Sequence, residues 1–219
     1  MLVLADLIGL AATAFLYRAL TFGVVSIVSP VAGTYGGVTA VLSFLVGEHL
    51  GRIGAAGLLL TFIGGLIVAT PQPARPASPS GRAWLASAGA AAMLYGVSFW
   101  ISGRYVIPVL GILVPSVVYY LLGIVSIPLF AWASRSRLSA PSVREVPFVL
   151  GATTLGCGGS LALAAAQSSG YVAVATVLSA LASAVTVVLA WMILRERLPL
   201  YGWAGLAILT VGLVTLHLD

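Results

Sequence analysis

The chain has 219 residues, of which 61% are hydrophobic and 7% are charged, and its mean hydropathy is +1.15. About a quarter of the residues of a soluble domain are charged, so this composition excludes an ordinary soluble domain and indicates a protein embedded in a lipid bilayer. The net charge of +5 comes from arginines that lie mostly between apolar runs. That placement favours contact with lipid headgroups and argues against a nucleic-acid partner.

Uncharged apolar runs divide the chain into eight expected membrane spans. A helix needs about 20 residues to cross about 30 Å of hydrocarbon, and most of these runs approach or exceed that length. They are continuously apolar rather than alternating, so we expect an all-α polytopic bundle and not a β-barrel. The expected spans are residues 1–17, 23–46, 53–70, 83–103, 109–133, 146–166, 171–194 and 199–217.

A segment rich in proline and serine, residues 71–82, separates the third span from the fourth. Proline ends a helix because it lacks a backbone N–H and clashes with the preceding turn. We therefore predict a domain of three helices over residues 1–70, a linker over 71–82 and a domain of five helices over 83–219.

The second and third spans recur later in the chain as the seventh and eighth. Adding 148 to each residue number aligns the polar breaks between the paired spans and several small residues that follow them. Five spans fall within one period, and an odd number of spans reverses the direction of the second copy. Weak internal symmetry of this kind is typical of transporters that are built from inverted repeats. The aligned pairs are Glu48 with Glu196, Leu50 with Leu198, Gly54 with Gly202, Ala56 with Ala204, Gly57 with Gly205, Leu58 with Leu206, and Gly64 with Gly212.

At residues 45–50, Leu-Val-Gly-Glu-His-Leu, and again at 193–198, Ile-Leu-Arg-Glu-Arg-Leu, the chain resembles the EamA family of the drug/metabolite transporter superfamily. The resemblance implies ten helices in two inverted repeats of five, each ending in such a turn and a glycine-rich helix. Arg195 replaces the glycine of the first turn, and Leu178 stands where the first half has Pro30. Only three spans precede the linker, so the resemblance also implies that the first two helices of the family are lacking before Met1.

The arginines and the family resemblance predict opposite orientations. If the spans alternate, eight of the ten arginines share one side of the membrane. The positive-inside rule makes that side cytoplasmic and both termini external, whereas the resemblance implies cytoplasmic termini. In either orientation we expect a multi-pass protein of the cell membrane.

Asp6 is the only acidic residue inside an apolar run. A carboxylate in lipid is costly unless it is protonated or paired, so Asp6 is a possible proton site. The alternative is an interfacial position, since six residues of helix span only about 9 Å.

Several polar and aromatic side chains are candidates for the wall of a substrate cavity. Tyr35 and Tyr95 lie in the middle of spans, where a hydroxyl needs a hydrogen-bonding partner or a wet cavity. Prolines inside spans mark expected helix kinks, which cavity-lining helices tolerate. The cavity candidates are Tyr35, Tyr95, Trp100, Tyr119 and Gln167, and the kink candidates are Pro30, Pro115 and Pro128.

These features predict a secondary transporter of small metabolites, such as amino acids or amphipathic compounds, with alternating access between the two repeats. The alternative is a non-transporting assembly partner or a truncated remnant of such a carrier. An enzyme is not expected, because His49 lies in a turn and His217 at the chain end. We expect no cofactor and no metal. The partners that we expect are a small-molecule substrate, the lipid bilayer and a second copy bound through the glycine-rich helices 53–70 or 199–217.

Overall fold

The computed structural model describes residues 1–47, 51–68, 81–133, 142–193 and 200–216. Within these ranges every regular element is helical. The turn residues Glu48 and Glu196 and most of the linker 71–82 lie outside them. In chain order the elements are α1 (Leu2–Phe22), α2 (Val25–Gly33), α3 (Tyr35–Leu45), α4 (Arg52–Val68), α5 (Gly81–Ile101), the π-helix η1 (Ser102–Val106), α6 (Ile107–Leu110), α7 (Leu113–Ala133), α8 (Val146–Gln167), α9 (Val172–Ser179), α10 (Leu181–Ile193) and α11 (Leu200–Leu216).

The predicted all-helical membrane bundle is confirmed. Five helical units of the described chain are long and apolar enough to cross a membrane, and three shorter apolar helices accompany them. Two expected span ends were wrong. Helix α1 continues past Arg18 to Phe22, and the fourth span continues through Arg104 as η1 and α6 to Leu110. Both arginines are exposed, and a long side chain can carry its charge to the headgroups without ending the helix.

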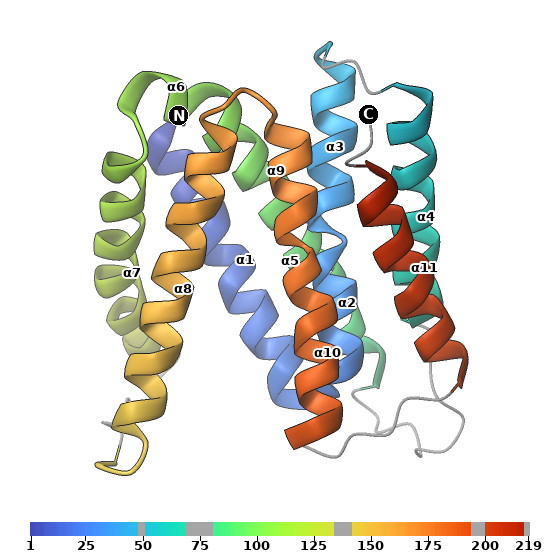
Figure 1. The fold of residues 1–219 in the computed structure, drawn as a ribbon. Helices are drawn as coiled ribbons and strands as arrows, with labels where there is room; N and C mark the ends of the chain where they lie inside the picture. The colour runs from blue at the N-terminus through green and yellow to red at the C-terminus, as the bar shows by residue number, and fades with distance from the viewer. Residues whose placement is uncertain (48–50, 69–80, 134–141, 194–199, 217–219) are drawn as a thin grey trace.

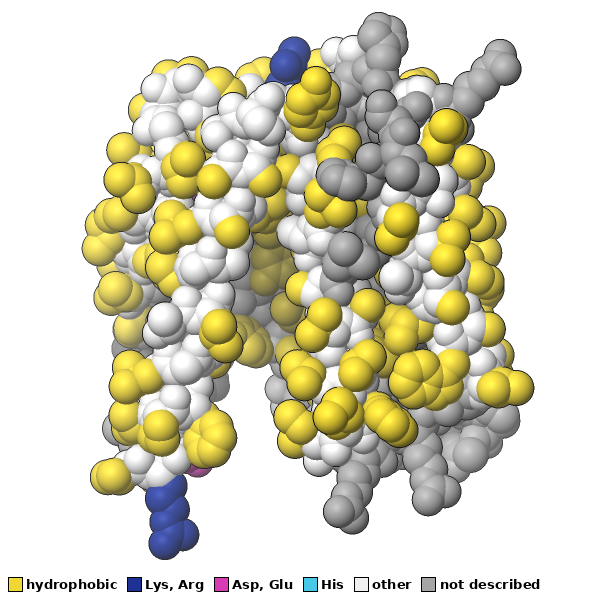
Figure 2. Space-filling view, in the orientation of Figure 1, with side chains coloured by type: hydrophobic (Ala, Val, Ile, Leu, Met, Phe, Trp, Pro, Cys, Tyr) yellow, Lys and Arg dark blue, Asp and Glu magenta, His cyan; other side chains and the backbone are white. Residues whose placement is uncertain are grey.

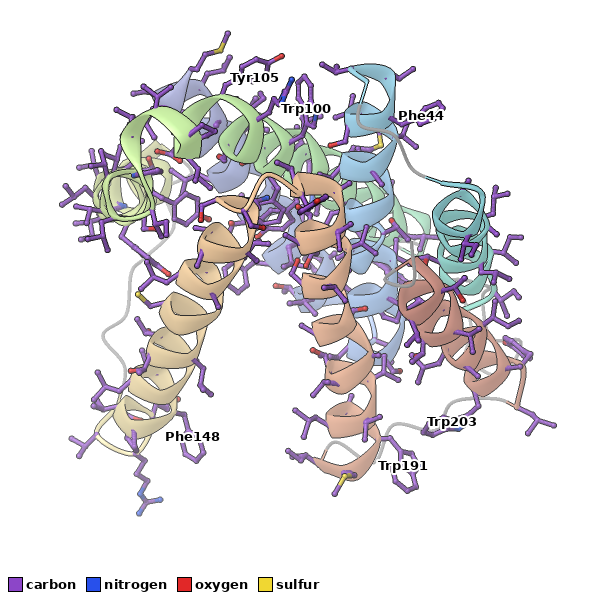
Figure 3. The ribbon with its side chains drawn as sticks, turned by 45° about the horizontal axis from the view of Figure 1, so that its top comes forward. Phe44, Trp100, Tyr105, Phe148, Trp191 and Trp203 are labelled. Atoms are coloured by element: carbon purple, nitrogen blue, oxygen red, sulfur yellow. The ribbon has the colours of Figure 1, made fainter. Side chains whose placement is uncertain are left out.

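The surface carries the pattern of a membrane-embedded protein. In Figure 2 hydrophobic side chains cover the lateral face, and the described arginine side chains stand at its upper and lower ends. Figure 3 places Phe44, Trp100 and Tyr105 at the upper end and Phe148, Trp191 and Trp203 at the lower end. Aromatic side chains gather at the two membrane interfaces, so these two groups mark the upper and lower boundaries of the apolar belt.

The two matching helical corners lie at opposite ends of the bundle. In Figure 1, α3 ends and α4 begins at the top, whereas α10 ends and α11 begins at the bottom. Both chain termini lie toward the top. A displacement of 148 residues therefore turns the helical hairpin upside down, as the odd number of spans predicts.

Helices α4 and α11 pack closely through glycines. A Cβ atom added to Gly64 would lie 2.7 Å from the carbonyl oxygen of Gly205, and one added to Gly212 would lie 2.7 Å from that of Gly57. Adding 148 to Gly57 and Gly64 gives Gly205 and Gly212, so the internal repeat turns each of these two contacts into the other. The pair is thus antiparallel and locally two-fold symmetric. Small residues allow such an approach where the lipid gives helices no hydrophobic reason to associate. The glycine faces predicted for dimer contact meet within one chain, and a homodimer stays a prediction.

Two spans are broken near their middle, and they cross each other at the breaks. Helix α2 passes into α3 at Thr34, and α9 passes into α10 at Ala180, each through a residue with ψ near 0° (−4° and −16°). Helix α2 packs on α10, and α3 packs on α9. Pro30 lies buried inside α2 four residues before the first break, while Leu178 occupies the matching position in α9, so the second break forms without proline.

The other two candidate kink residues lie in α7. Pro128 is inside this helix. Pro115 is in its first turn, where a missing N–H removes no intrahelical hydrogen bond, so no kink is required there.

Helices α1 and α8 are related by the same displacement but differ in their surroundings. Helix α1 packs along α5, and 28% of its most apolar stretch is buried, compared with 6% for α8. Ala5 and Asp6 are buried, whereas the equivalent Thr153 and Thr154 are exposed. Figure 2 shows the molecule hollowed between α8 and α10, open toward the bottom.

Candidate functional site

The crossing of the two broken spans is built on small residues. A Cβ atom added to Gly36 of α3 would lie 3.0 Å from Cα of Val177 in α9. One added to Gly33 would lie 2.6 Å from Oγ of Ser183 in α10. Because the backbones approach this closely, the side chains beside the crossing meet across the two halves of the chain.

Tyr35 joins the two breaks directly. It is the first residue of α3, and its hydroxyl lies 2.8 Å from Oγ of Ser179, the last residue of α9. Its ring makes edge contacts with Tyr95 and Phe99 of α5, at centroid distances of 6.1 and 5.2 Å. Tyr95 and Phe99 stack on each other at 5.5 Å. The predicted partner for the mid-span hydroxyl of Tyr35 is therefore found in the opposite half.

The hydroxyl of Thr13 in α1 lies within hydrogen-bonding distance of two tyrosine hydroxyls. Its Oγ1 lies 2.9 Å from the hydroxyl of Tyr95 and 3.0 Å from that of Tyr119. Thr13 donates its own hydrogen to the carbonyl oxygen of Gly9, so both tyrosines donate to Thr13. Each phenol oxygen keeps lone pairs that can accept a hydrogen bond from a substrate.

Asp6 lies on the same face of α1 as Gly9 and Thr13, one and two turns away. Its side chain is 4% exposed, and its Oδ2 has no hydrogen-bonding partner. The ring of Tyr119 approaches this face, with Cε2 3.2 Å from a Cβ atom added to Gly9. A buried carboxyl oxygen without a donor is the arrangement expected of a group that carries a proton or receives a cation.

Gln167 closes the upper end of the crossing. It is the last residue of α8 and is 2% exposed. Its Nε2 donates to Oγ1 of Thr176 in α9 at 2.9 Å and to the carbonyl oxygen of Phe99 at 3.3 Å. This amide therefore holds three helices together above the aromatic cluster of Tyr35, Tyr95 and Phe99.

Trp100 lies apart from the other cavity candidates. Its ring makes an edge contact with Tyr105 at 5.5 Å and packs on Ala5, Ile101 and Val106 near the upper end. It lines a small pocket of its own. The candidates thus divide into a central group and one residue near the membrane boundary.

The central group offers hydroxyl and amide hydrogen bonds on an aromatic wall. Among the residues that the structure describes, no three His, Cys, Asp or Glu side chains gather to hold a metal ion. Aromatic surface with a few hydrogen-bonding groups is the usual lining of sites for small, partly apolar molecules.

Comparison with known proteins identifies the family. The model of the EamA-like transporter family matches residues 79–218, which is more than half of the chain. The chain belongs to the EamA-like transporter family. The family is one of membrane transporters of the drug/metabolite transporter superfamily, so the predicted resemblance is confirmed for this EamA-like chain.

A solved structure described only as "Crystal structure of protein" has a similar fold. It superposes on the EamA-like chain with a TM-score of 0.67 at 18% identity, covering 98% of this chain and 75% of that one. At this identity the similarity shows the fold alone. No curated protein matches the chain.

Sequence reasoning named four of the central residues of this EamA-like chain and missed their partners. Thr13, Ser179 and Phe99 give no distinctive signal in the sequence, because hydroxyls and phenylalanines occur in most spans. The displacement of 148 residues relates Tyr35 to Ser183 and not to Ser179, so the repeat gave no clue to this pair.

The hydrogen bond between Tyr35 and Ser179 should couple the two halves energetically. We expect Tyr35→Phe and Ser179→Ala each to lower stability by about 1 kcal/mol and to be non-additive by about 0.5 to 1 kcal/mol. The measurement is a double-mutant cycle of unfolding free energies in detergent. Thr186→Ala, on an exposed hydroxyl of α10 that bonds only its own helix, is the matched control. Strictly additive effects would show that the two hydroxyls do not interact.

Proposed function

We propose that the chain is a secondary carrier of small metabolites, with its substrate site at the crossing of the α2–α3 and α9–α10 spans. The observation that carries this proposal is the pair of equivalent spans that are both broken near their middle and are joined there by Tyr35 and Ser179. In transporters with inverted repeats, substrates bind where discontinuous helices meet near the midplane.

A hollow that is open at one end of the bundle supports alternating exposure. The hollow between α8 and α10 opens toward the bottom of Figure 2, while Gln167, Thr176 and Phe99 join three helices above the crossing. Rocking of one half against the other would exchange the open and the closed end. Tyr35 and Ser179 lie at the pivot of that motion, and their hydrogen bond would adjust as the halves move.

The chemistry of the wall suggests the class of substrate. Tyr35, Tyr95 and Phe99 offer aromatic surface, and Thr13 and Gln167 add a few polar atoms. A small molecule with an apolar group and a few hydrogen-bonding groups fits this wall, such as an apolar amino acid or an amphipathic compound. Asp6 is the group that would couple such transport to protons.

The test is substrate uptake into proteoliposomes made from cell-membrane lipids. The chain is reconstituted in two forms, one beginning at Met1 and one extended by any residues encoded upstream of Met1. A panel of amino acids and amphipathic compounds is then supplied under a proton gradient. We expect saturable uptake that Tyr35→Phe reduces severalfold, while Tyr171→Phe, exposed at the start of α9, leaves it unchanged. Absence of uptake from both forms would overturn the proposal for these substrates.

A second candidate, an assembly partner that does not transport alone, is favoured by the open face of α8. Only 6% of the most apolar stretch of α8 is buried, and Thr153 and Thr154 are exposed where the equivalent Ala5 and Asp6 of α1 are buried. In that case uptake would appear only when additional helices cover this face. Reaction of Cys157 on α8 with a lipid-soluble maleimide tests whether this face is covered: we expect the chain alone to be labelled faster than the chain whose face is filled.

A further inference from the structure

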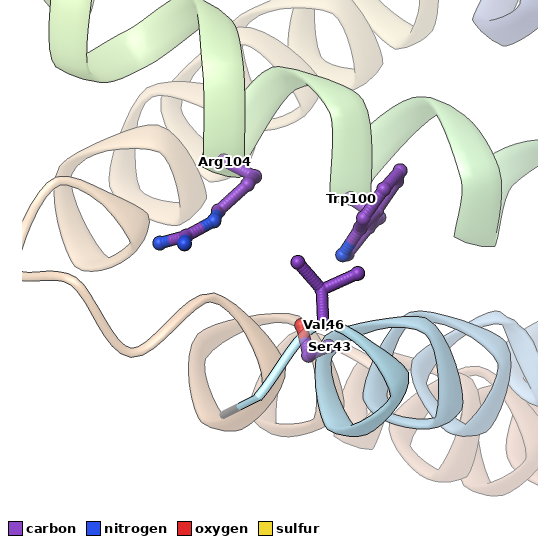
Figure 4. Close-up of a pocket in the computed structure, with 4 residues that line it drawn as sticks. All are labelled: Ser43, Val46, Trp100 and Arg104. Atoms are coloured by element: carbon purple, nitrogen blue, oxygen red, sulfur yellow. The ribbon is translucent and has the colours of Figure 1, made fainter. Parts of the chain in front are cut away.

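A small pocket lies where the end of α3 meets the junction of α5 and η1. Ser43 and Val46 line it from one side, and Trp100 and Arg104 line it from the other (Figure 4). Its volume of about 10 Å3 is room for one water-sized group, such as one oxygen of a ligand whose remainder stays outside. The pocket belongs to neither the crossing nor the Asp6 cluster, and it bridges the two halves of the chain.

Ser43 contributes a spare hydroxyl to this pocket. The side chain is 3% exposed, and its Oγ has no hydrogen-bonding partner. Many helical hydroxyls of the bundle donate to a carbonyl oxygen three or four residues back, as Ser179 does to Thr176 and Thr13 does to Gly9. Ser43 does not, and in Figure 4 its oxygen points from α3 toward the helix that carries Trp100 and Arg104. A buried hydroxyl without a partner calls for a ligand atom.

Trp100 and Arg104 add two further donors. The indole and guanidinium groups donate hydrogen bonds and accept none. Within the described chain, neither side chain makes a hydrogen bond or an ion pair, and the guanidinium is exposed. Arg104 lies in the π-helical turn, whose neighbour Gly103 packs against Val172 on the other side, so the turn is fixed in place. π-turns occur frequently at functional sites.

We propose that Ser43, Trp100 and Arg104 form a binding site for an oxyanion, either a carboxylate or a phosphate group. The three donor side chains line one pocket, no acidic side chain lines it among the described residues, and a bound anion accepts charge-assisted hydrogen bonds from such donors. A bound anion would tie the end of α3 to η1 and hold this end of the bundle closed. The site does not depend on the proposed transport, so either inference can fail while the other stands.

The test uses fluorescence of Trp100 in the purified full chain. The other four tryptophans are replaced by phenylalanine, and sodium phosphate or sodium acetate is titrated against sodium chloride at constant ionic strength. We expect a saturable change in emission that Arg104→Gln weakens about tenfold or more and Ser43→Ala weakens severalfold. Arg144→Gln, an exposed arginine before α8, is the matched control and should respond like the parent chain. Size-exclusion chromatography confirms that each variant is folded.

The source of the oxyanion is decided in lipid nanodiscs. If a lipid headgroup supplies it, discs with phosphatidylglycerol will shift the emission relative to phosphatidylcholine alone, and added phosphate will have no further effect. If a soluble anion supplies it, phosphate or acetate will act equally in both discs. An unchanged response in Arg104→Gln, or no response of the parent chain to any of these anions, would overturn the proposal.

Discussion

Replacing Gly64 of α4 by alanine is expected to lower the unfolding free energy of the purified chain by about 2 kcal/mol, because overpacked interiors lose about 1 to 3 kcal/mol. The added Cβ atom would meet the backbone of Gly205 and Leu209 in α11, the former at 2.7 Å, and backbone cannot rotate away as a side chain can. The two helices must separate along their whole contact. The midpoint of thermal unfolding, followed by size-exclusion chromatography in detergent, measures the loss.

The internal symmetry makes this prediction stricter. Gly212→Ala places its Cβ atom against Thr61 and Gly57 in the symmetry-related contact, so its cost should equal that of Gly64→Ala within about 1 kcal/mol. Gly158→Ala on α8 is the control. Nothing lies within 4 Å of its added Cβ atom, so alanine should be neutral or should gain up to about 1 kcal/mol from helix propensity. A neutral Gly212→Ala beside a damaging Gly64→Ala would contradict the two-fold arrangement.

Neutralising Asp6 is expected to separate function from stability. Asp6→Asn should reduce proton-driven uptake at least tenfold, because the amide cannot exchange a proton. Asp6→Leu should raise stability by about 1 to 2 kcal/mol, since it removes a buried carboxyl oxygen that has no hydrogen bond. Uptake under a proton gradient and thermal unfolding measure the two effects.

Glu145→Gln is the control for the loss of an acidic charge outside the proposed proton site. Glu145 is exposed before α8, and its carboxylate accepts a hydrogen bond from the backbone N–H of Ser142 at 2.8 Å, which holds its pKa below the usual value. Its replacement should leave uptake unchanged. If Asp6→Asn retained full proton-driven uptake, Asp6 would be an interfacial residue and not a proton site.

Two kinds of sequence signal predicted most of the fold. Continuous apolar runs predicted an all-helical bundle, in which five described helices are long and apolar enough to cross a membrane and three more are shorter, because lipid requires each crossing segment to satisfy its own backbone. The displacement of 148 residues predicted which glycines correspond, and Gly57 and Gly64 do meet Gly212 and Gly205. Small residues at fixed spacing carry this information because only they permit close packing of helices in lipid.

The centre of the site was less accessible to sequence reasoning. Pro30 predicted a kink in the span that breaks at Thr34, but no proline marked the break at Ala180, which was not predicted. The meeting of Tyr35 with Ser179 depends on how two distant spans cross, which no local pattern encodes. Arg104 was taken as a span end, because a charge usually ends an apolar run. Arg104 lies exposed within a π-turn, where its long side chain can carry the charge to the headgroups while the helix continues.

Cysteine labelling of the two matching corners tests the inverted arrangement most directly. In a Cys157→Ala background, single cysteines replace Leu45 at the end of α3, which is 72% exposed, or Leu200 at the start of α11, which is 88% exposed. A membrane-impermeant maleimide is added to cells before and after permeabilisation. One position should react in intact cells and the other only after permeabilisation, which also settles the orientation. Reaction of both positions from the same side would contradict the inverted arrangement and the transport site proposed at its centre.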